Sequence, residues 1–159
     1  MTSLRSVLMF LAACGGDTSD PSAPDAGEHI SSTVDAAMPM PGPTICQQAK
    51  DHSDFAWLQE HVFTPSCATA MCHGGPEPEV GLNLSAGAAY NNLVNKGAST
   101  VTGWTRVVPG KLTESYLAVS LGRAEGPPPR DGYMPLGADA LCLEKLQAIE
   151  RWILLGANP

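Results

Sequence analysis

The most chemically distinctive part of the chain is Cys67-Ala68-Thr69-Ala70-Met71-Cys72-His73, in which a histidine directly follows the second of two cysteines. Two thiols can add to the vinyl groups of haem, and an imidazole placed next to the second thiol can reach the iron. Covalent attachment usually has two residues between the cysteines, and here there are four. The pattern predicts a bound haem c, held by Cys67 and Cys72 and ligated by His73. The four-residue spacing between the cysteines departs from the usual haem-attachment motif.

Other chemistries for the same residues leave one alternative open. A local disulfide between Cys67 and Cys72, with His73 exposed, is compatible with the sequence. A zinc site needs three or four ligands, and the chain has no second Cys-x-x-Cys or histidine pair to supply them. A thioredoxin-like redox pair has a different spacing and lies in a βαβ pattern that is not found here.

An electron-carrying haem iron needs a sixth ligand, and a thioether raises its reduction potential. Met134 lies 61 residues after His73 in Gly-Tyr-Met-Pro-Leu-Gly, where rigid neighbours could present it from a loop. We therefore predict Met134 as the distal ligand, with the alternative that it fills space in the core. The methionines and histidines that we do not expect to ligate are Met38, Met40, Met71, His29, His52 and His61.

The N-terminus resembles a bacterial lipoprotein signal. Arg5 precedes a short apolar run, and Leu11-Ala12-Ala13-Cys14 matches the lipobox, whose cysteine receives a diacylglycerol. The apolar run is shorter than the roughly 20 residues that a membrane-spanning helix needs. We expect residues 1–13 to be a signal peptide and Cys14 to be lipidated; an ordinary signal with an incidental cysteine is the alternative.

Residues 14–45 are rich in Asp, Pro, Ser, Ala and Gly and predict a disordered linker, because they offer too little apolar surface to offset the entropy of ordering. The linker carries five of the 16 acidic residues, whereas the chain from Cys46 onward has 11 acidic against 8 basic residues. Acidity is thus mainly a property of the linker. The shortage of Lys and Arg argues against a nucleic-acid partner.

Residues 46–159 predict a small all-α domain of short helices and long loops. Apolar spacing predicts a first helix over 50–62, which ends before Pro65, and a last helix over 138–155, which ends at Gly156. Between them we expect a second helix capped by Ser85 and a third that follows Thr113. We expect glycines to close the second and third helices and residues 124–137 to form an extended loop, because three consecutive prolines exclude a helix. Long ordered loops in a small domain need an organising element, which a bound cofactor would supply.

Several motifs occur in the order found in one family. They are Phe55-Ala56-Trp57-Leu58-Gln59, Val62-Phe63-Thr64-Pro65-Ser66-Cys67, Cys72-His73-Gly74-Gly75, Gly81-Leu82-Asn83-Leu84-Ser85, Arg106-Val107-Val108-Pro109-Gly110, Ser115-Tyr116-Leu117, Met134-Pro135, Ile149-Glu150-Arg151-Trp152-Ile153 and Gly156-Ala157. From 55 to 157 the chain resembles the cytochrome c-like domains of planctomycete and myxobacterial secreted proteins. The resemblance implies a cytochrome c-like fold in which the last helix packs across the first. It also implies thioethers at Cys67 and Cys72, a proximal His73 and a distal Met134.

Of the remaining cysteines, Cys46 lies just before the first predicted helix and Cys142 near the start of the last one, and the resemblance implies that these two helices cross. In an oxidising exported compartment the two cysteines are expected to form a disulfide, with two separate buried thiols as the alternative. Under the haem hypothesis the five cysteines divide into one lipid thioether, two haem thioethers and one disulfide.

The function expected from these observations is single-electron transfer between redox partner proteins of the cell envelope. We expect a monomer, anchored by lipid and facing the periplasm or the exterior; Gly15 in place of an aspartate favours the outer membrane. We do not expect an enzyme, although an open sixth iron position would allow peroxidase-like activity. The alternative function is a haem-free, disulfide-stabilised binding or structural lipoprotein with the same fold.

Overall fold

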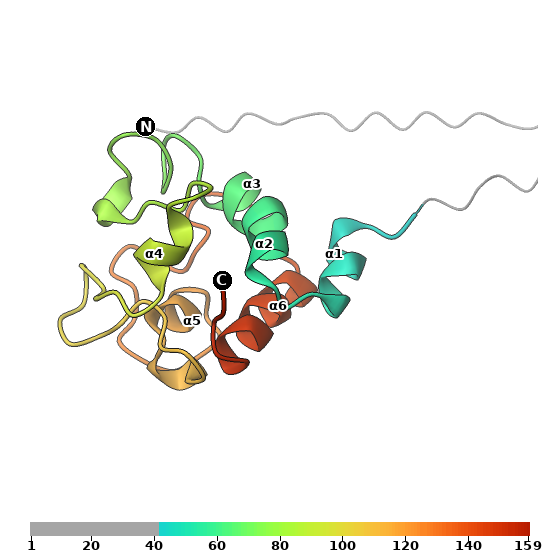
Figure 1. Ribbon diagram of the computed structural model, residues 1–159. Helices are drawn as coiled ribbons and strands as arrows, with labels where there is room; N and C mark the ends of the chain where they lie inside the picture. Colours follow the sequence, from blue (N-terminus) through green and yellow to red (C-terminus); the bar gives the residue numbers. More distant parts are fainter. Residues whose placement is uncertain (1–41) are drawn as a thin grey trace, which may run out of the picture. The chain divides into compact units, whose positions relative to one another are not determined.

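The computed structural model of the protein describes residues 42–159 (Figure 1). The expected signal peptide, the lipidation at Cys14 and all but the last residues of the expected linker lie outside the described residues. His29, Met38 and Met40 lie outside them as well. The expectations for those positions therefore stay predictions.

Helices provide the regular structure of residues 42–159, and no named strand forms there. Backbone pairing is limited to isolated bridges between Val94 and Val107, Gly97 and Thr105, and Thr105 and Ser115. The all-α class is confirmed at this level. The α-helices are α1 (Ile45–Gln48), α2 (Phe55–Leu58), α3 (Thr64–Ser66), α4 (Ala89–Leu93), α5 (Tyr116–Ser120) and α6 (Leu143–Leu154), and the short 3₁₀ or π turns are η1 (Ala49–Asp51), η2 (Gln59–Phe63), η3 (Glu79–Gly81) and η4 (Leu112–Glu114).

The first long helical stretch is formed by α2, η2 and α3 in succession, so the helix predicted over 50–62 is wrong at both ends. It begins after Asp54 because the carboxylate of Asp54 accepts the backbone N–H of Trp57 at 2.9 Å, which satisfies a free donor of the first turn. It continues past Pro65 because η2 has π spacing and Pro65 lies in the first turn of α3, where a missing N–H is tolerated.

The next two helices also depart from the sequence prediction at their ends. The N-cap of α4 is Ala88, without a side-chain bond, so the cap predicted at Ser85 is wrong. The chain leaves α4 through Asn95, at φ 56°, rather than through a glycine. Thr113 falls within η4, and α5 starts after Ser115 and is followed by Gly122, at φ 68°, as predicted.

The last helix, α6, is shorter than the predicted 138–155; its predicted apolar positions Ile149, Trp152 and Ile153 are buried, whereas Leu143 is 52% exposed. Cys142 holds extended backbone angles at the N-cap, so the helix starts only at Leu143. Gly156, at φ 101°, follows the C-cap and ends the helix as predicted. The buried residues of α6 are Ala148, Ile149, Trp152 and Ile153.

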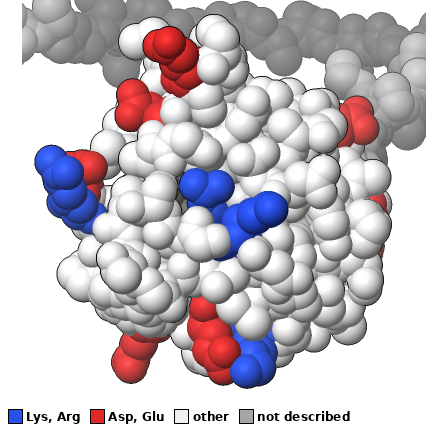
Figure 2. All heavy atoms as spheres, turned by 60° about the vertical axis from the view of Figure 1, so that its left-hand side comes forward, with Lys and Arg blue, Asp and Glu red and all other residues white. Residues whose placement is uncertain are grey.

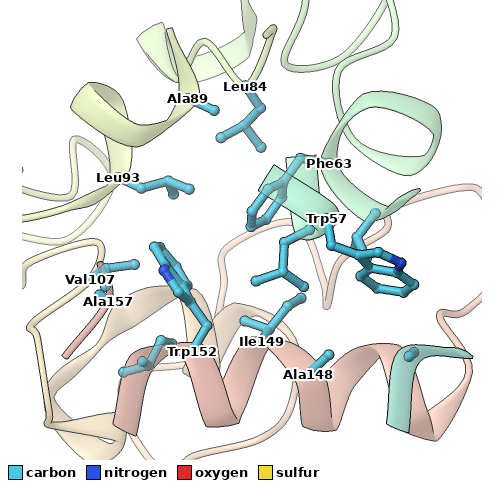
Figure 3. Packing of buried hydrophobic residues seen from close by; sticks show 14 residues of the cluster. Trp57, Phe63, Leu84, Ala89, Leu93, Val107, Ala148, Ile149, Trp152 and Ala157 are labelled. Atoms are coloured by element: carbon cyan, nitrogen blue, oxygen red, sulfur yellow. The ribbon is translucent and has the colours of Figure 1, made fainter. Parts of the chain in front are cut away.

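The core lies between α6, the 55–66 helical stretch and α4 (Figure 3). The ring centroid of Trp152 is 5.2 Å from that of Phe55 and 6.4 Å from that of Phe63, and Phe55 makes an edge contact with Tyr90. The indole N–H of Trp152 donates to the carbonyl of Asn158 at 2.7 Å, so its polar end is satisfied although the side chain is buried.

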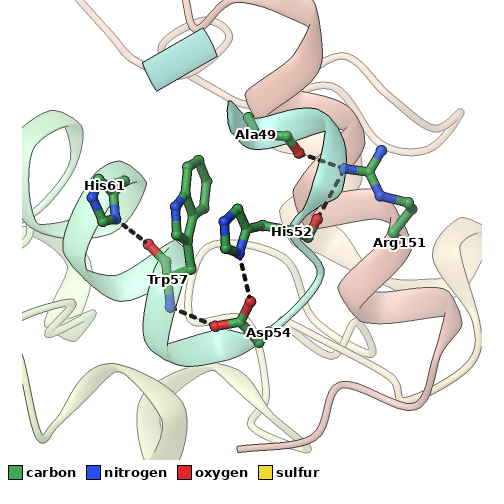
Figure 4. Close-up of polar contacts among 6 residues, drawn as sticks. All are labelled: Ala49, His52, Asp54, Trp57, His61 and Arg151. Atoms are coloured by element: carbon green, nitrogen blue, oxygen red, sulfur yellow. Dashed lines mark hydrogen bonds and ion pairs between the residues drawn. The ribbon is translucent and has the colours of Figure 1, made fainter. Parts of the chain in front are cut away.

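Residues 45–52 are fastened to α6 in two ways. Cys46 and Cys142 form the predicted disulfide, which is thereby confirmed. The guanidinium of Arg151 donates to the carbonyls of Ala49 at 2.6 Å and His52 at 2.9 Å (Figure 4). These contacts hold the start of the described chain against its last helix.

Among residues 42–159, no helix has the length and apolar character that crossing a membrane requires.

Breaking the disulfide tests how far the fold depends on it. Cys46 and Cys142 are 96 residues apart in sequence, so their bond removes much conformational freedom from the unfolded chain. Cys142→Ser should lower the free energy of unfolding by about 4 kcal/mol, as measured by urea denaturation. Wild-type protein with its disulfide reduced is the control, and its free energy of unfolding should match that of Cys142→Ser protein. An unchanged urea midpoint in Cys142→Ser protein would contradict a stabilising role.

Candidate cofactor site

The cysteine loop starts where α3 ends and folds back on itself through its backbone. The N–H groups of Cys67 and Ala68 both donate to the carbonyl of Phe63, which terminates the helix. The N–H of His73 donates to the carbonyl of Cys67 at 3.0 Å, so the four-residue spacer forms a closed turn with its two ends together.

Gly74 is required by this turn. A Cβ at position 74 would lie 2.2 Å from the carbonyl oxygen of Ala68 and 2.9 Å from that of Thr69, and both are backbone atoms that cannot easily give way. The glycine after the histidine therefore allows the loop to close over its own backbone, whatever the loop binds.

The four residues predicted from the sequence as cofactor ligands line one pocket of about 670 Å³. Cys67, Cys72 and His73 come from the cysteine loop, and Met134 comes from the predicted 124–137 loop. The volume of this pocket is within the range of small-molecule and cofactor sites. Apolar side chains supply most of the lining, among them Phe63, Leu82, Leu84, Leu93, Leu117, Leu121, Leu141 and Ile149.

His73 has the hydrogen-bonding pattern of a ligand histidine. Its Nδ1 lies 3.3 Å from the carbonyl oxygen of Glu79, which can only accept, so this contact favours the tautomer with the proton on Nδ1 and the lone pair on Nε2. Burial lowers the pKa of His73, and the nearby Arg106 lowers it further, against the opposing effects of the backbone and charge of Glu79 and of the backbone of Leu82. The imidazole is therefore neutral at pH 7, as metal ligation requires.

The two loop cysteines are free thiols in the structure, so the alternative disulfide between them is not formed there. Burial raises the pKa of Cys67 to about 11, with a further contribution from Cys72 and a small opposing one from Lys145. Cys67 is thus a neutral thiol at pH 7 and part of the apolar wall of the pocket.

The loop that carries Met134 is attached to α5 at two points. The N–H of Met134 donates to the carbonyl of Ser120 at 2.8 Å. Gly126 packs so closely that a Cβ there would lie 2.8 Å from Val119 and 3.0 Å from Trp104. Residues 124–137 contain no helix, in agreement with the loop prediction. Met71, by contrast, is 87% exposed at the edge of the pocket.

Arg106 lines the pocket, although it was not predicted as a site residue from the sequence. Its guanidinium donates to the carbonyl of Asn92 at 2.9 Å and lies 3.5 Å from the hydroxyl of Ser99. Burial lowers its pKa, yet an arginine stays charged in a protein. Arg106 therefore places a cation on a largely apolar wall; its only sequence signal was its place in the Arg-Val-Val-Pro-Gly motif.

His52 and His61 do not line the pocket but stack on the two faces of Trp57 (Figure 4). The ring centroids lie 4.5 Å apart for His52 and 4.7 Å for His61. His52 also bonds Asp54, and His61 bonds the carbonyl of Trp57. Both histidines therefore stabilise the local structure around Trp57 and are not among the residues that line the pocket.

Within residues 42–159, no group of three or more His, Cys, Asp or Glu side chains is placed to hold a metal ion. A haem iron held by one imidazole and one thioether would not need such a group.

Comparisons with family models, curated proteins and solved structures find no match to this chain.

The reactivity of Cys67 provides a test of its environment. Because burial raises its pKa to about 11, the thiolate fraction should grow about tenfold per pH unit between pH 8 and pH 10. Iodoacetamide labelling of haem-free protein, followed by peptide mass spectrometry, should show the same rise in the Cys67 labelling rate. Cys72→Ser protein, which removes the neighbouring thiol, is the control; a rate that is already constant above pH 9 would contradict the burial.

Proposed function

We propose that this protein is a c-type haem-binding lipoprotein that carries single electrons between redox partners of the bacterial cell envelope. The observation that carries the proposal is the gathering of Cys67, Cys72, His73 and Met134 around one pocket. These residues were selected from the sequence for their chemistry, and the first and last of them are 67 positions apart in the chain. A cytochrome c-like fold is part of the same proposal.

Several properties of the pocket residues support haem as the bound group. Its mostly apolar lining suits a porphyrin, and two thiols supply the nucleophiles for thioether formation. His73 offers a free Nε2 and Met134 a soft thioether. The guanidinium of Arg106 supplies a positive charge for the propionate carboxylates.

Electron transfer is favoured over catalysis by the ligand set. Haem supplies a one-electron iron couple when bound. If His73 and Met134 both held the iron, they would leave no position for a substrate, and the thioether would raise the potential. The protein supplies a water-poor wall, a fixed imidazole and a loop attached to α5. If Met134 were displaced, the open position would allow peroxidase-like chemistry.

The partner would contact the edge of the pocket. Three apolar residues of the lining are strongly exposed: Met71 at 87%, Val80 at 47% and Leu136 at 51%. Figure 2 shows that uncharged residues predominate over one face of the molecule. The lining also has exposed charges, with Arg130 at 88% and Asp131 at 68% side-chain exposure, so contact with the partner would combine apolar burial with charged groups.

Lipid attachment at Cys14 completes the proposal and would hold the domain at a membrane surface facing the periplasm or the exterior, with the outer membrane favoured. It rests on the lipobox resemblance, in a part of the chain outside the described residues.

Covalent haem gives the first test. Full-length protein purified from a bacterial host with a cytochrome c maturation system should be red, with a Soret band that persists after denaturation because thioethers do not dissociate. Cys67→Ser/Cys72→Ser protein is the control and should lose its colour on denaturation. Colourless wild-type protein in normal yield would end the haem proposal and favour the haem-free structural or binding lipoprotein.

Replacing Met134 tests the distal ligand. Met134→Ala should open the sixth iron position, change the visible spectrum and lower the reduction potential by on the order of 100 mV, because the thioether favours the reduced iron. Met71→Ala removes an exposed methionine of the same pocket edge and should leave the spectrum unchanged. An unchanged spectrum in Met134→Ala would reject Met134 as a ligand.

A further inference from the structure

Val80 adopts a backbone conformation that its side chain disfavours. Its φ is 51° and its ψ is 24°, in the left-handed region, where a β-branched residue is a genuine outlier. The side chain is 47% exposed, so core packing does not compensate for the strain. Strained backbone that persists is held by its surroundings and is concentrated at functional sites.

Two hydrogen bonds hold this turn from outside: the N–H of Glu79 donates to the carbonyl of Cys72 at 2.8 Å, and Ser99 bonds the strained residue itself. The hydroxyl of Ser99 donates to the carbonyl of Val80 at 2.7 Å, from 19 residues further along the chain. The guanidinium of Arg106 lies 3.5 Å from the same hydroxyl oxygen and is itself fixed on the carbonyl of Asn92. Ser99 and Arg106 thus connect the turn to the end of α4.

The turn determines where the carbonyl of Glu79 points. That carbonyl belongs to the peptide plane between Glu79 and Val80, and rotation about φ of Val80 sets the angle between this plane and the rest of Val80. The carbonyl accepts the N–H of Leu82 at 3.1 Å and lies 3.3 Å from Nδ1 of His73. A change in φ at Val80 would move this oxygen away from the imidazole.

We propose that Ser99 is a positioning residue for His73. Its bond to the carbonyl of Val80 holds the left-handed turn, which keeps the carbonyl of Glu79 on Nδ1 of His73 and leaves the lone pair on Nε2. The use of Nε2 for iron rests on the proposed function, whereas the control of the imidazole tautomer does not. Such outer contacts orient a ligand histidine and increase its basicity.

The tautomer can be measured without haem. In haem-free full-length protein with ¹⁵N-labelled histidine, at a pH where the imidazole is neutral, wild-type His73 should be mainly the Nδ1–H tautomer. Ser99→Ala should convert most of it to the Nε2–H form, which predominates in free histidine, and Ser99→Thr, which keeps the hydroxyl, should restore the wild-type form. His73→Gln identifies the signal among the four histidines.

Ser53→Ala is the matched control, because it also removes a serine hydroxyl but Ser53 lies outside the lining of the pocket. It should leave the tautomer of His73 unchanged. If Ser99→Ala also leaves it unchanged, or if Ser53→Ala shifts it equally, the positioning role is rejected.

A double-mutant cycle tests the part played by strain. Glycine adopts the left-handed region freely, so in a Val80→Gly background the turn should hold itself and Ser99→Ala should have a much smaller effect on the tautomer. An equal effect in both backgrounds would show that Ser99 does not act through the strain at Val80 and would overturn the proposal.

In haem-loaded protein, Ser99→Ala should raise the reduction potential, because an imidazole without its Nδ1 bond donates less charge to iron. Ser53→Ala should not shift it. Colourless wild-type protein would refute the proposed function while the tautomer result stands. Red protein with unchanged tautomer and potential in Ser99→Ala would refute the positioning role alone.

Discussion

The aromatic contact of Trp152 with Phe55 and Phe63 joins the last helix of the chain to its first long helical stretch. Phe55 extends the same cluster to Tyr90 on α4. Much of the domain consists of loops, so these contacts supply the orientation that a sheet or a bundle of long helices would otherwise provide. Phe63, Leu93 and Ile149 are buried in this core and also line the pocket. The position of the pocket walls is therefore set by the same packing that stabilises the fold.

Some features were predictable from local chemistry, and one long-range feature was predictable from the family resemblance. The apolar face of α6 and its end at Gly156 follow from spacing and from the freedom of glycine, and the disulfide followed from the crossing of two helices that the family resemblance implied. The gathering of Cys72 and Met134 in one pocket was expected from their side-chain chemistry. The ends of the helices were harder to predict from the sequence. Asp54 caps a helix that the apolar spacing alone would start earlier, and a π turn continues the helix past Pro65.

Other features depended on long-range contacts that no local pattern shows. Arg106 reaches the pocket because its guanidinium is held by the carbonyl at Asn92, 14 residues away in sequence. The carbonyl of Glu79 lies 3.3 Å from Nδ1 of His73 beside a turn in which Val80 occupies a conformation that its residue type disfavours. A prediction from propensity would place Val80 in extended backbone, so the sequence argues against the geometry that the turn adopts.

The disulfide between Cys46 and Cys142 also gives the domain a closed covalent topology. Every residue that lines the pocket, except Ile149, lies on the chain between these two cysteines. A single backbone cleavage within that interval would open the ring without releasing a fragment, since both pieces remain joined through sulfur. After such a cleavage the pocket would be retained by a two-chain molecule rather than lost with a departing peptide.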